Sequence, residues 1–166
     1  TELYNRWAGR IRYFFLKLYN YDSDAADDRT QDTFLKILEN APMFDAQQRF
    51  SPWLYSIAYN LYKNDLRRRQ HDVVFRESAA WGPIAEMPLA ERKLEINSSA
   101  EFVNKYLDLL DPDVKTMFIL RHAEEMSVPE IARVTSCPEG TVKSRLFYAM
   151  KKIAGQLHTS KINEWI

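Results

Sequence analysis

Several residue types that other classes of protein depend on are scarce in this sequence. It has one cysteine, Cys137, and three histidines, so it offers neither a disulfide pair nor a metal-ligand spacing. A single thiol fits a reducing cytoplasm. Only four glycines are present, which leaves little room for β-turns or a glycine-rich phosphate loop. We therefore expect no disulfide, no metal and no cofactor.

Long apolar runs and an excess of one charge are also absent. No run approaches the roughly 18 residues that span a bilayer, and no signal-peptide pattern opens the sequence. We therefore expect a cytoplasmic protein without membrane insertion. The 23 basic and 23 acidic residues cancel, so any DNA contact must come from local patches. No Ser/His/Asp or Cys/His arrangement suggests a nucleophile, so we expect no catalytic residue, no small-molecule substrate and no enzymatic activity.

The sequence is rich in amphipathic helical patterns, and its 166 residues suffice for one domain or two small ones. A first helix is indicated by apolar residues at helical spacing, namely Leu3, Trp7, Ile11, Phe14, Phe15 and Leu18. A second begins near Ser23 with acidic first turns, which suit the positive end of the helix dipole. Its later core face is expected to contain Phe34, Ile37 and Leu38.

The stretch 50–69 is the most informative helix. Ser51 followed by Pro52 predicts its start, and three consecutive arginines at 67–69 predict its end. Two stripes follow from the spacing, one of Leu54, Ile57, Ala58 and Leu61, the other of Tyr55, Tyr59, Tyr62 and Leu66. Either the aromatic residues belong to a core and the arginines are solvated, or the helix presents stacking rings, an amide and cations to nucleic acid.

The remaining chain predicts a second helical unit. Residues 1–70 form the first domain, 71–97 an extended linker with Gly and Pro breaks, 98–157 the second domain and 158–166 a C-terminal tail. Helix starts are expected at the capping boxes 98–101, 127–130 and 136–139, and at Asp111-Pro112. The last two helices are separated by a short turn, as in a helix-turn-helix.

The last helix carries an unusual face. Its core residues are expected to be Val142, Leu146, Ala149 and Ile153. Away from them lie Lys143, Ser144, Phe147, Tyr148 and Lys151. In a major groove, Lys143 could contact a guanine and Phe147 a thymine methyl. The alternative is that Phe147 and Tyr148 pack against another domain.

Three motifs resemble one family, the bacterial sigma factors of the extracytoplasmic-function group. DRTQDTFLK at 28–36 is similar to its Asp-Leu-x-Gln-Glu-Thr-Phe segment, and WLYSIAYN at 53–60 matches its Trp-Leu-x-x-Ile-Ala-x-Asn. CPEGTVKSRL at 137–146 resembles its recognition helix. The resemblance covers about residues 3–70 and 98–157. It implies an all-α fold of a region 2 bundle and a region 4 helix-turn-helix joined by an extended linker.

The resemblance also implies a function. A promoter-specificity subunit would bind core RNA polymerase and promoter DNA, and the resemblance also leads us to expect an anti-sigma factor as a partner. Docking on core polymerase would use Asp28, Gln31, Asp32 and Phe34. Recognition and opening of the −10 element, including capture of a flipped base, would use Phe44, Arg49, Trp53, Asn60, Lys63, Arg67 and Arg68. Recognition of the −35 element would use Thr141, Lys143, Ser144, Phe147 and Lys151.

Some positions depart from the family pattern. Arg29 stands where an apolar residue is usual, and Lys115 where an arginine is common; Tyr148 and Met150 replace frequent arginines. Two other classes stay open from the residues alone. One is a helix-turn-helix repressor or activator that binds DNA by itself, and the other is a helical interaction protein without DNA binding. Promoter-specific transcription with core polymerase would separate all three.

Overall fold

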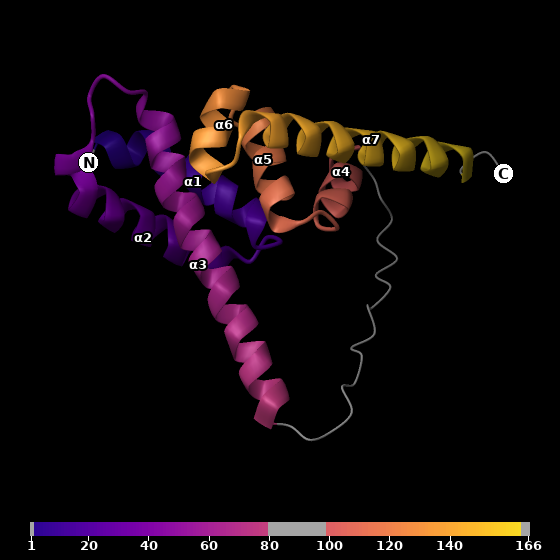
Figure 1. Ribbon diagram of the computed structural model, residues 1–166, viewed down its shortest axis with the longest axis horizontal. Helices are drawn as coiled ribbons and strands as arrows, with labels where there is room; N and C mark the ends of the chain where they lie inside the picture. Colours follow the sequence, from indigo (N-terminus) through magenta and orange to yellow (C-terminus); the bar gives the residue numbers. More distant parts are fainter. Residues whose placement is uncertain (1, 80–98, 164–166) are drawn as a thin grey trace.

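The computed structural model describes the backbone of residues 2–79 and 99–163, and the side chains of residues 2–71 and 103–156. Over this part the chain is all-α, as predicted, with no strand (Figure 1). Its elements are α1 (Glu2–Leu18), α2 (Ser23–Asn40), the 3-10 helix η1 (Ala41–Met43), α3 (Phe50–Ala79), α4 (Ser99–Leu107), α5 (Pro112–His122), α6 (Val128–Thr135) and α7 (Glu139–Asn163).

A tight turn joins α1 to α2. Asn20 and Tyr21 adopt left-handed backbone angles, with φ of 53° and 66°, and the Asp22 side chain then caps α2 by accepting from the Ala25 N–H at 3.1 Å. The predicted second helix is therefore confirmed. Its expected core face is partly wrong, because Leu38 is 73% exposed whereas Ile37 is buried.

The core of the N-terminal half is aromatic. Phe14 packs edge-on against Phe15 and Tyr55, with ring centroids 5.6 and 5.2 Å apart, and Tyr19 meets Tyr62 at 5.4 Å. Such pairs stabilise a core beyond the area that they bury. The tyrosine stripe of α3 is therefore core, as the first of our two interpretations held. These rings are not a stacking surface for bases.

The buried face of α3 is displaced from the predicted aliphatic stripe. Leu54 and Ala58 are buried, but Ile57 and Leu61 are only half-buried, and Tyr59 is 4% exposed. The reason is that α3 has neighbours on more than one side. It packs against α2 and α6 (Figure 1), and its tyrosines also meet rings of α1. A helix with two packing partners buries an arc wider than one amphipathic stripe.

Helix α3 also has different ends from those predicted. It begins at Phe50, so Ser51 lies inside the first turn rather than at the cap. It continues through the three arginines to Ala79, so residues 71–79 of the predicted extended linker are helical. The rest of the predicted linker lies outside the described residues. Similarly, α7 continues to Asn163 through most of the predicted tail.

Local capping motifs position the helices of the C-terminal half. Asp111 caps α5, and Ser127 and Glu130 form the predicted capping box of α6, with Glu130 Oε2 accepting from the Ser127 N–H at 2.8 Å. The cap predicted at Ser136 is wrong. Ser136 has φ of 53° and ends α6, because its N–H donates to the carbonyl of Ala132, and α7 begins only at Glu139.

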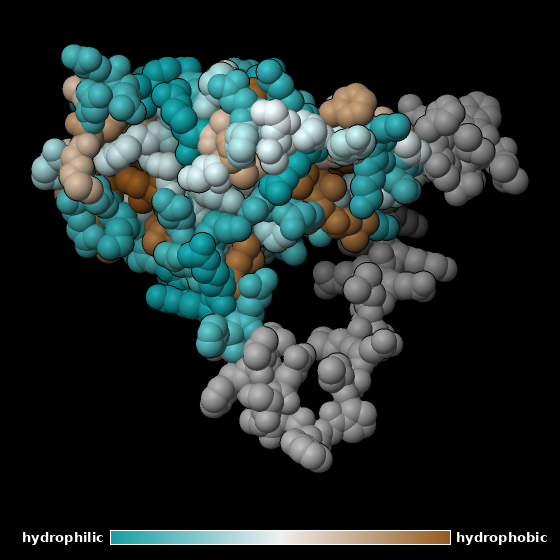
Figure 2. Space-filling view, in the orientation of Figure 1, coloured by the Kyte–Doolittle hydropathy of each residue, from teal (hydrophilic) through white to brown (hydrophobic). Residues whose placement is uncertain are grey.

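The core of the C-terminal half forms where α5, α6 and α7 meet. Val142, Leu146, Ala149 and Ile153 are buried, as predicted for one face of α7. Helix α7 then extends beyond the other helices (Figure 1). In the space-filling view, apolar residues gather beneath α7 near α4 and α5, whereas hydrophilic residues cover α3 where it leaves the body (Figure 2).

Candidate nucleic-acid interface

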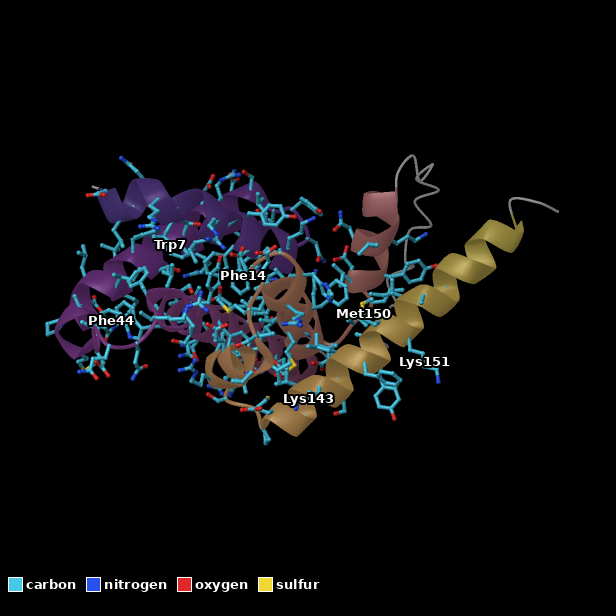
Figure 3. All side chains as sticks on the ribbon, turned by 90° about the horizontal axis from the view of Figure 1, so that it is seen from above. Trp7, Phe14, Phe44, Lys143, Met150 and Lys151 are labelled. Carbon is cyan, nitrogen blue, oxygen red and sulfur yellow. The ribbon has the colours of Figure 1, made fainter. Side chains whose placement is uncertain are left out.

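The connection between α2 and α3 forms an aromatic cluster at one end of the N-terminal half. Phe44 lies 4.8 Å from Trp53 and 5.6 Å from Phe50 between ring centroids, and Trp7 lies 5.7 Å from Phe50. Trp7 and Phe44 appear at the same end of the molecule in Figure 3. Phe44 and Trp53 are both half-buried. The cluster therefore combines a fixed position with ring surface that a base could stack on.

A small groove adjoins this cluster. Its volume is about 120 Å³, and it is lined by Gln48, Arg49, Pro52, Trp53, Ser56 and Arg133. Arg49 and Trp53 belong to the residues predicted for the −10 element. Arg133 comes from α6, eighty-odd positions further along the chain, and sequence reasoning missed it. Only the packing of α6 against α3 could have revealed it.

One flank of α3 runs from this groove along the helix. Trp53, Asn60 and Arg67 follow one another at seven-residue spacing, so they share a stripe, and Asn60, Arg67 and Arg68 are exposed. Lys63 is different because it is turned toward α5. Its Nζ lies 2.7 Å from Asp113 Oδ1. The structure thus places the exposed residues along one face and holds Lys63 beside the C-terminal half.

Asp113 is the centre of a small polar cluster. The Tyr59 hydroxyl donates to Asp113 Oδ1 at 2.7 Å, and Arg145 NH1 lies 3.9 Å from Asp113 Oδ2. Burial alone would raise the pKa of Asp113, but the hydrogen bonds from Lys63 and Tyr59 outweigh it and lower that pKa. Burial, with the neighbouring Asp113 carboxylate, raises the pKa of Tyr59. The cluster therefore holds a carboxylate anion and a neutral phenol.

Glu130 forms a second contact between the halves. Its Oε1 accepts from Arg49 NH1 at 2.5 Å, and its side chain is 6% exposed while that of Arg49 is 75% exposed. Burial would raise the pKa of Glu130, but hydrogen bonds from Ser127 and the charges of Arg49 and Arg133 lower it. The same carboxylate therefore caps α6 and faces a residue predicted to bind DNA.

The predicted recognition face of α7 is open. Lys143, Ser144 and Lys151 are exposed, and Thr141 is half-buried. Lys143 lies in the first turns of α7 and Lys151 further along it (Figure 3). Phe147 and Tyr148 are 63% and 65% exposed, with centroids 5.5 Å apart. The alternative that these two rings pack against another domain is therefore wrong for this structure.

The predicted docking residues lie on α2. Asp28 and Gln31 are exposed, whereas the Phe34 ring packs on Tyr4 with centroids 4.7 Å apart. The Asp32 carboxylate contacts the Arg29 guanidinium. Arg29, the position that departs from the family pattern, is thus used inside this chain, and it partly neutralises the acidic face.

Comparison with known proteins agrees with this geometry. The described part of the chain is all-helical, and α6 and α7, joined by a short turn, form a helix-turn-helix. Residues 3–71 match the family described as Sigma-70 region 2, and residues 103–153 match Sigma-70, region 4.

Curated relatives extend the likeness over most of the chain. One is the ECF RNA polymerase sigma factor EcfG of Rhodopseudomonas palustris, 30% identical over 89% of this chain and 79% of that protein. Another is the RNA polymerase sigma-H factor of Pseudomonas aeruginosa, 32% identical over 80% of this chain and 73% of that protein. The chain belongs to the family of extracytoplasmic-function (ECF) RNA polymerase sigma factors. Its function is to direct promoter-specific initiation by RNA polymerase. The two alternative classes left open by the residues are not favoured.

Solved structures share the fold. The sigma factor RpoE of Bartonella quintana, determined in complex with the anti-sigma factor NepR, aligns with a TM-score of 0.74 at 24% identity and 95% coverage of both chains. CnrH, determined with the cytosolic domain of CnrY, aligns with a TM-score of 0.65 at 22% identity, over 95% of this chain and 86% of that one. At these identities the likeness establishes the fold alone.

Two further findings bear on the kind of site present. Within residues 2–79 and 99–163, none of the helices combines the length and the hydropathy of a membrane span. Among the described side chains, no three His, Cys, Asp or Glu residues converge as a metal site would require.

Proposed function

We propose that the N-terminal half, residues 1–70, docks on core polymerase and opens the −10 element, while residues 98–157 read the −35 element. This division of roles rests on one observation: the chain has two surfaces of different character. One combines a half-buried aromatic cluster with the exposed amide of Asn60, and the other is the open face of α7. Stacking suits unpaired bases, and a helix face suits the major groove.

On the −10 side, we assign Phe44 and Trp53 to stacking and Asn60 to the edge of an extruded base. Extrusion costs a few kcal/mol, which stacking and edge hydrogen bonds must offset. The cations of this surface hold the adjoining backbone, namely Arg49, Lys63, Arg67 and Arg68. On the −35 side, Lys143, Ser144 and Phe147 contact base edges, and Thr141 and Lys151 contact phosphate.

For docking, we assign the exposed part of α2, with Asp28, Gln31 and Asp32 facing a basic surface and Phe34 supporting them. We further propose that the protein acts in the cytoplasm, without catalytic residues or a cofactor of its own, and that an anti-sigma factor regulates it. The last point rests on the shared fold with sigma factors that were determined with anti-sigma factors.

The decisive experiment is transcription by purified core polymerase with and without this chain. The template is sheared genomic DNA of the source organism, and the start sites are mapped by sequencing. We expect new start sites that share two upstream elements and appear only with the chain. Start sites identical to those of core enzyme alone, despite measurable binding of the chain to core, would contradict the proposal.

A further inference from the structure

The face of α2 that we assign to polymerase docking is acidic, but it contains a cation, Arg29. Arg29 follows Asp28 directly and lies three residues before Asp32, so Arg29 and Asp32 are neighbours on the helix surface. The Arg29 guanidinium contacts the Asp32 carboxylate, whose side chain is 42% exposed. Asp32 can therefore be reached from outside the chain. A basic group of the polymerase that approaches Asp32 must share this carboxylate with Arg29.

A second carboxylate holds Arg29 in this position. Arg29 Nε lies 2.8 Å from Asp65 Oδ2 on α3, and the Asp65 side chain is 14% exposed. The hydroxyl of Tyr19, a buried residue, also donates to Asp65 Oδ2 at 2.5 Å. Because a guanidinium presents its N–H donors in one rigid plane, a single arginine can bridge two carboxylates. Asp65 therefore fixes Arg29 beside Asp32 and keeps its charge on the docking face.

The two acidic docking residues consequently differ in what they offer to a partner. Asp28 is exposed, whereas Asp32 already has a cation within contact distance. An ion pair at such an exposed position is weak, because solvent screens it. A basic group of the polymerase can therefore displace Arg29 from Asp32. The displacement opposes docking without preventing it.

We infer that Arg29 lowers the affinity of this chain for core polymerase, because it occupies Asp32 until a basic group of the polymerase replaces it. The inference rests on the proposed docking role of Asp32. Arg29 acts through Asp32, and its own positive charge also opposes a basic partner. The chain therefore occupies core polymerase only at higher concentrations than it would without Arg29. The identity of residue 29 sets how readily this chain forms holoenzyme.

The test measures the affinity of the full-length chain for purified core polymerase. The chain carries a fluorophore at its N-terminus, and anisotropy is followed over a series of salt concentrations. Arg29→Met removes the charge but keeps a long, unbranched side chain that suits a helix. Arg29→Lys keeps the charge. The matched control is Lys36→Met, because Lys36 forms a pair of the same spacing on the same helix with Glu39, which is not among the proposed docking residues.

We expect Arg29→Met to bind core polymerase about two- to fivefold more tightly than wild type, the range that displacement of an exposed ion pair allows. Its affinity should also fall more steeply with salt, because one more unpaired carboxylate faces the basic partner. Arg29→Lys should stay close to wild type, and Lys36→Met should give no comparable gain. In an Asp32→Asn background, Arg29→Met should lose most of its gain.

Folding is checked separately, because Arg29→Met removes the ion-pair partner of Asp65. Asp65 retains the hydrogen bond from Tyr19, and Arg69 remains one turn further along α3, with its guanidinium 5.4 Å from the centroid of the Tyr19 ring. A second variant combines Arg29→Met with Asp65→Asn, whose amide oxygen can still accept from Tyr19. Circular dichroism melts verify that both variants are folded. Both should show the same gain in affinity for core polymerase.

Three results would overturn the inference. One is an unchanged or weaker affinity of folded Arg29→Met, since Arg29 would then orient Asp32 for docking instead of occupying it. Another is an equal gain from Lys36→Met. The third is a gain from Arg29→Met that is undiminished in the Asp32→Asn background, because the effect would then not pass through Asp32.

Asp28→Lys in the same assay separates this inference from the proposed docking face. If Asp28→Lys weakens core binding but Arg29→Met does not strengthen it, only the role of Arg29 is refuted. If neither Asp28→Lys nor Asp32→Asn weakens core binding, the assignment of the docking face is wrong, and the inference fails with it.

Discussion

The Nε atom of Arg29 lies 2.8 Å from Oδ2 of Asp65, and this ion pair joins α2 to α3. The same guanidinium contacts Asp32 on its own helix, and the Tyr19 hydroxyl donates to Asp65 Oδ2 at 2.5 Å. Burial of Arg29 would lower its pKa, but the two carboxylates outweigh this effect and raise it. Arg29 is therefore a structural cation in the middle of the proposed docking face. It partly neutralises Asp32, whereas Asp28 on the same face is exposed to solvent.

The first prediction concerns polymerase docking. Charge reversal at Asp28 or Asp32 should weaken binding to core polymerase, because both belong to an acidic face suited to a basic partner. Asp28→Lys should leave the free energy of unfolding within about 0.5 kcal/mol of wild type, since Asp28 is exposed. Asp32→Lys should also destabilise the fold, because it places a cation beside Arg29. Binding to core enzyme and urea denaturation measure the two effects. Unchanged core affinity in both variants would remove the assignment of this face.

The second prediction concerns strand opening. Asn60→Ala should impair open-complex formation on a duplex promoter, and the defect should shrink on a template already unpaired at the −10 element. On a pre-opened template the base is already unpaired, so part of the free-energy cost of extruding it no longer has to be supplied by the protein. Asn64→Ala tests whether the defect is confined to Asn60, because Asn64 is exposed on the same face of α3 one turn further along. Permanganate reactivity of unpaired thymines reports opening. Wild-type activity of Asn60→Ala on both templates would show that Asn60 has no part in melting.

The third prediction concerns the division of roles along α7. Lys143→Ala should cost about 1–3 kcal/mol on the preferred −35 sequence and relax discrimination there. Lys151→Ala should weaken all sequences similarly and reduce the salt slope by about one unit. Phe147→Ala should resemble Lys143→Ala, because an apolar contact with a thymine methyl releases no counterion. The measurement is holoenzyme binding to matched and −35-substituted promoters over a salt series. Identical shifts and slopes for both lysine variants would mean that α7 is only an electrostatic anchor.

The fourth prediction concerns the capping box of α6. Ser127→Ala should lower the free energy of unfolding by about 0.5–2 kcal/mol, because the hydroxyl accepts from the Glu130 N–H and donates to its carboxylate. Glu130→Gln should cost less at the cap, since its amide oxygen can still accept from the Ser127 N–H, but it removes the charge that faces Arg49. Chemical denaturation of both variants tests this. A Ser127→Ala variant as stable as wild type would show that the box does not stabilise the fold.

Local signals in the sequence were sufficient where the interacting groups are close along the chain. The box of Ser127 and Glu130 spans three residues, and Asp111 caps the helix that begins at the next residue. The face of α7 that contains Val142 and Leu146 follows from helical period alone. One of the local signals that misled did so because two patterns overlap. Ser136 fits an N-cap motif by spacing, but the end of α6 requires the same residue in a left-handed conformation.

The sequence by itself determined the helical class, most helix starts and the two surfaces proposed to bind DNA. Only the tertiary structure decided which face of α3 is buried, that Arg133 joins the groove beside Trp53, and that Lys63 meets Asp113. These contacts join residues far apart in the chain; Lys63 and Asp113, for example, are 50 positions apart. Helical period and capping depend on hydrogen bonds within one turn, and each segment carries them by itself. The burial of a residue depends on which other segment packs against it, and no single segment contains that information.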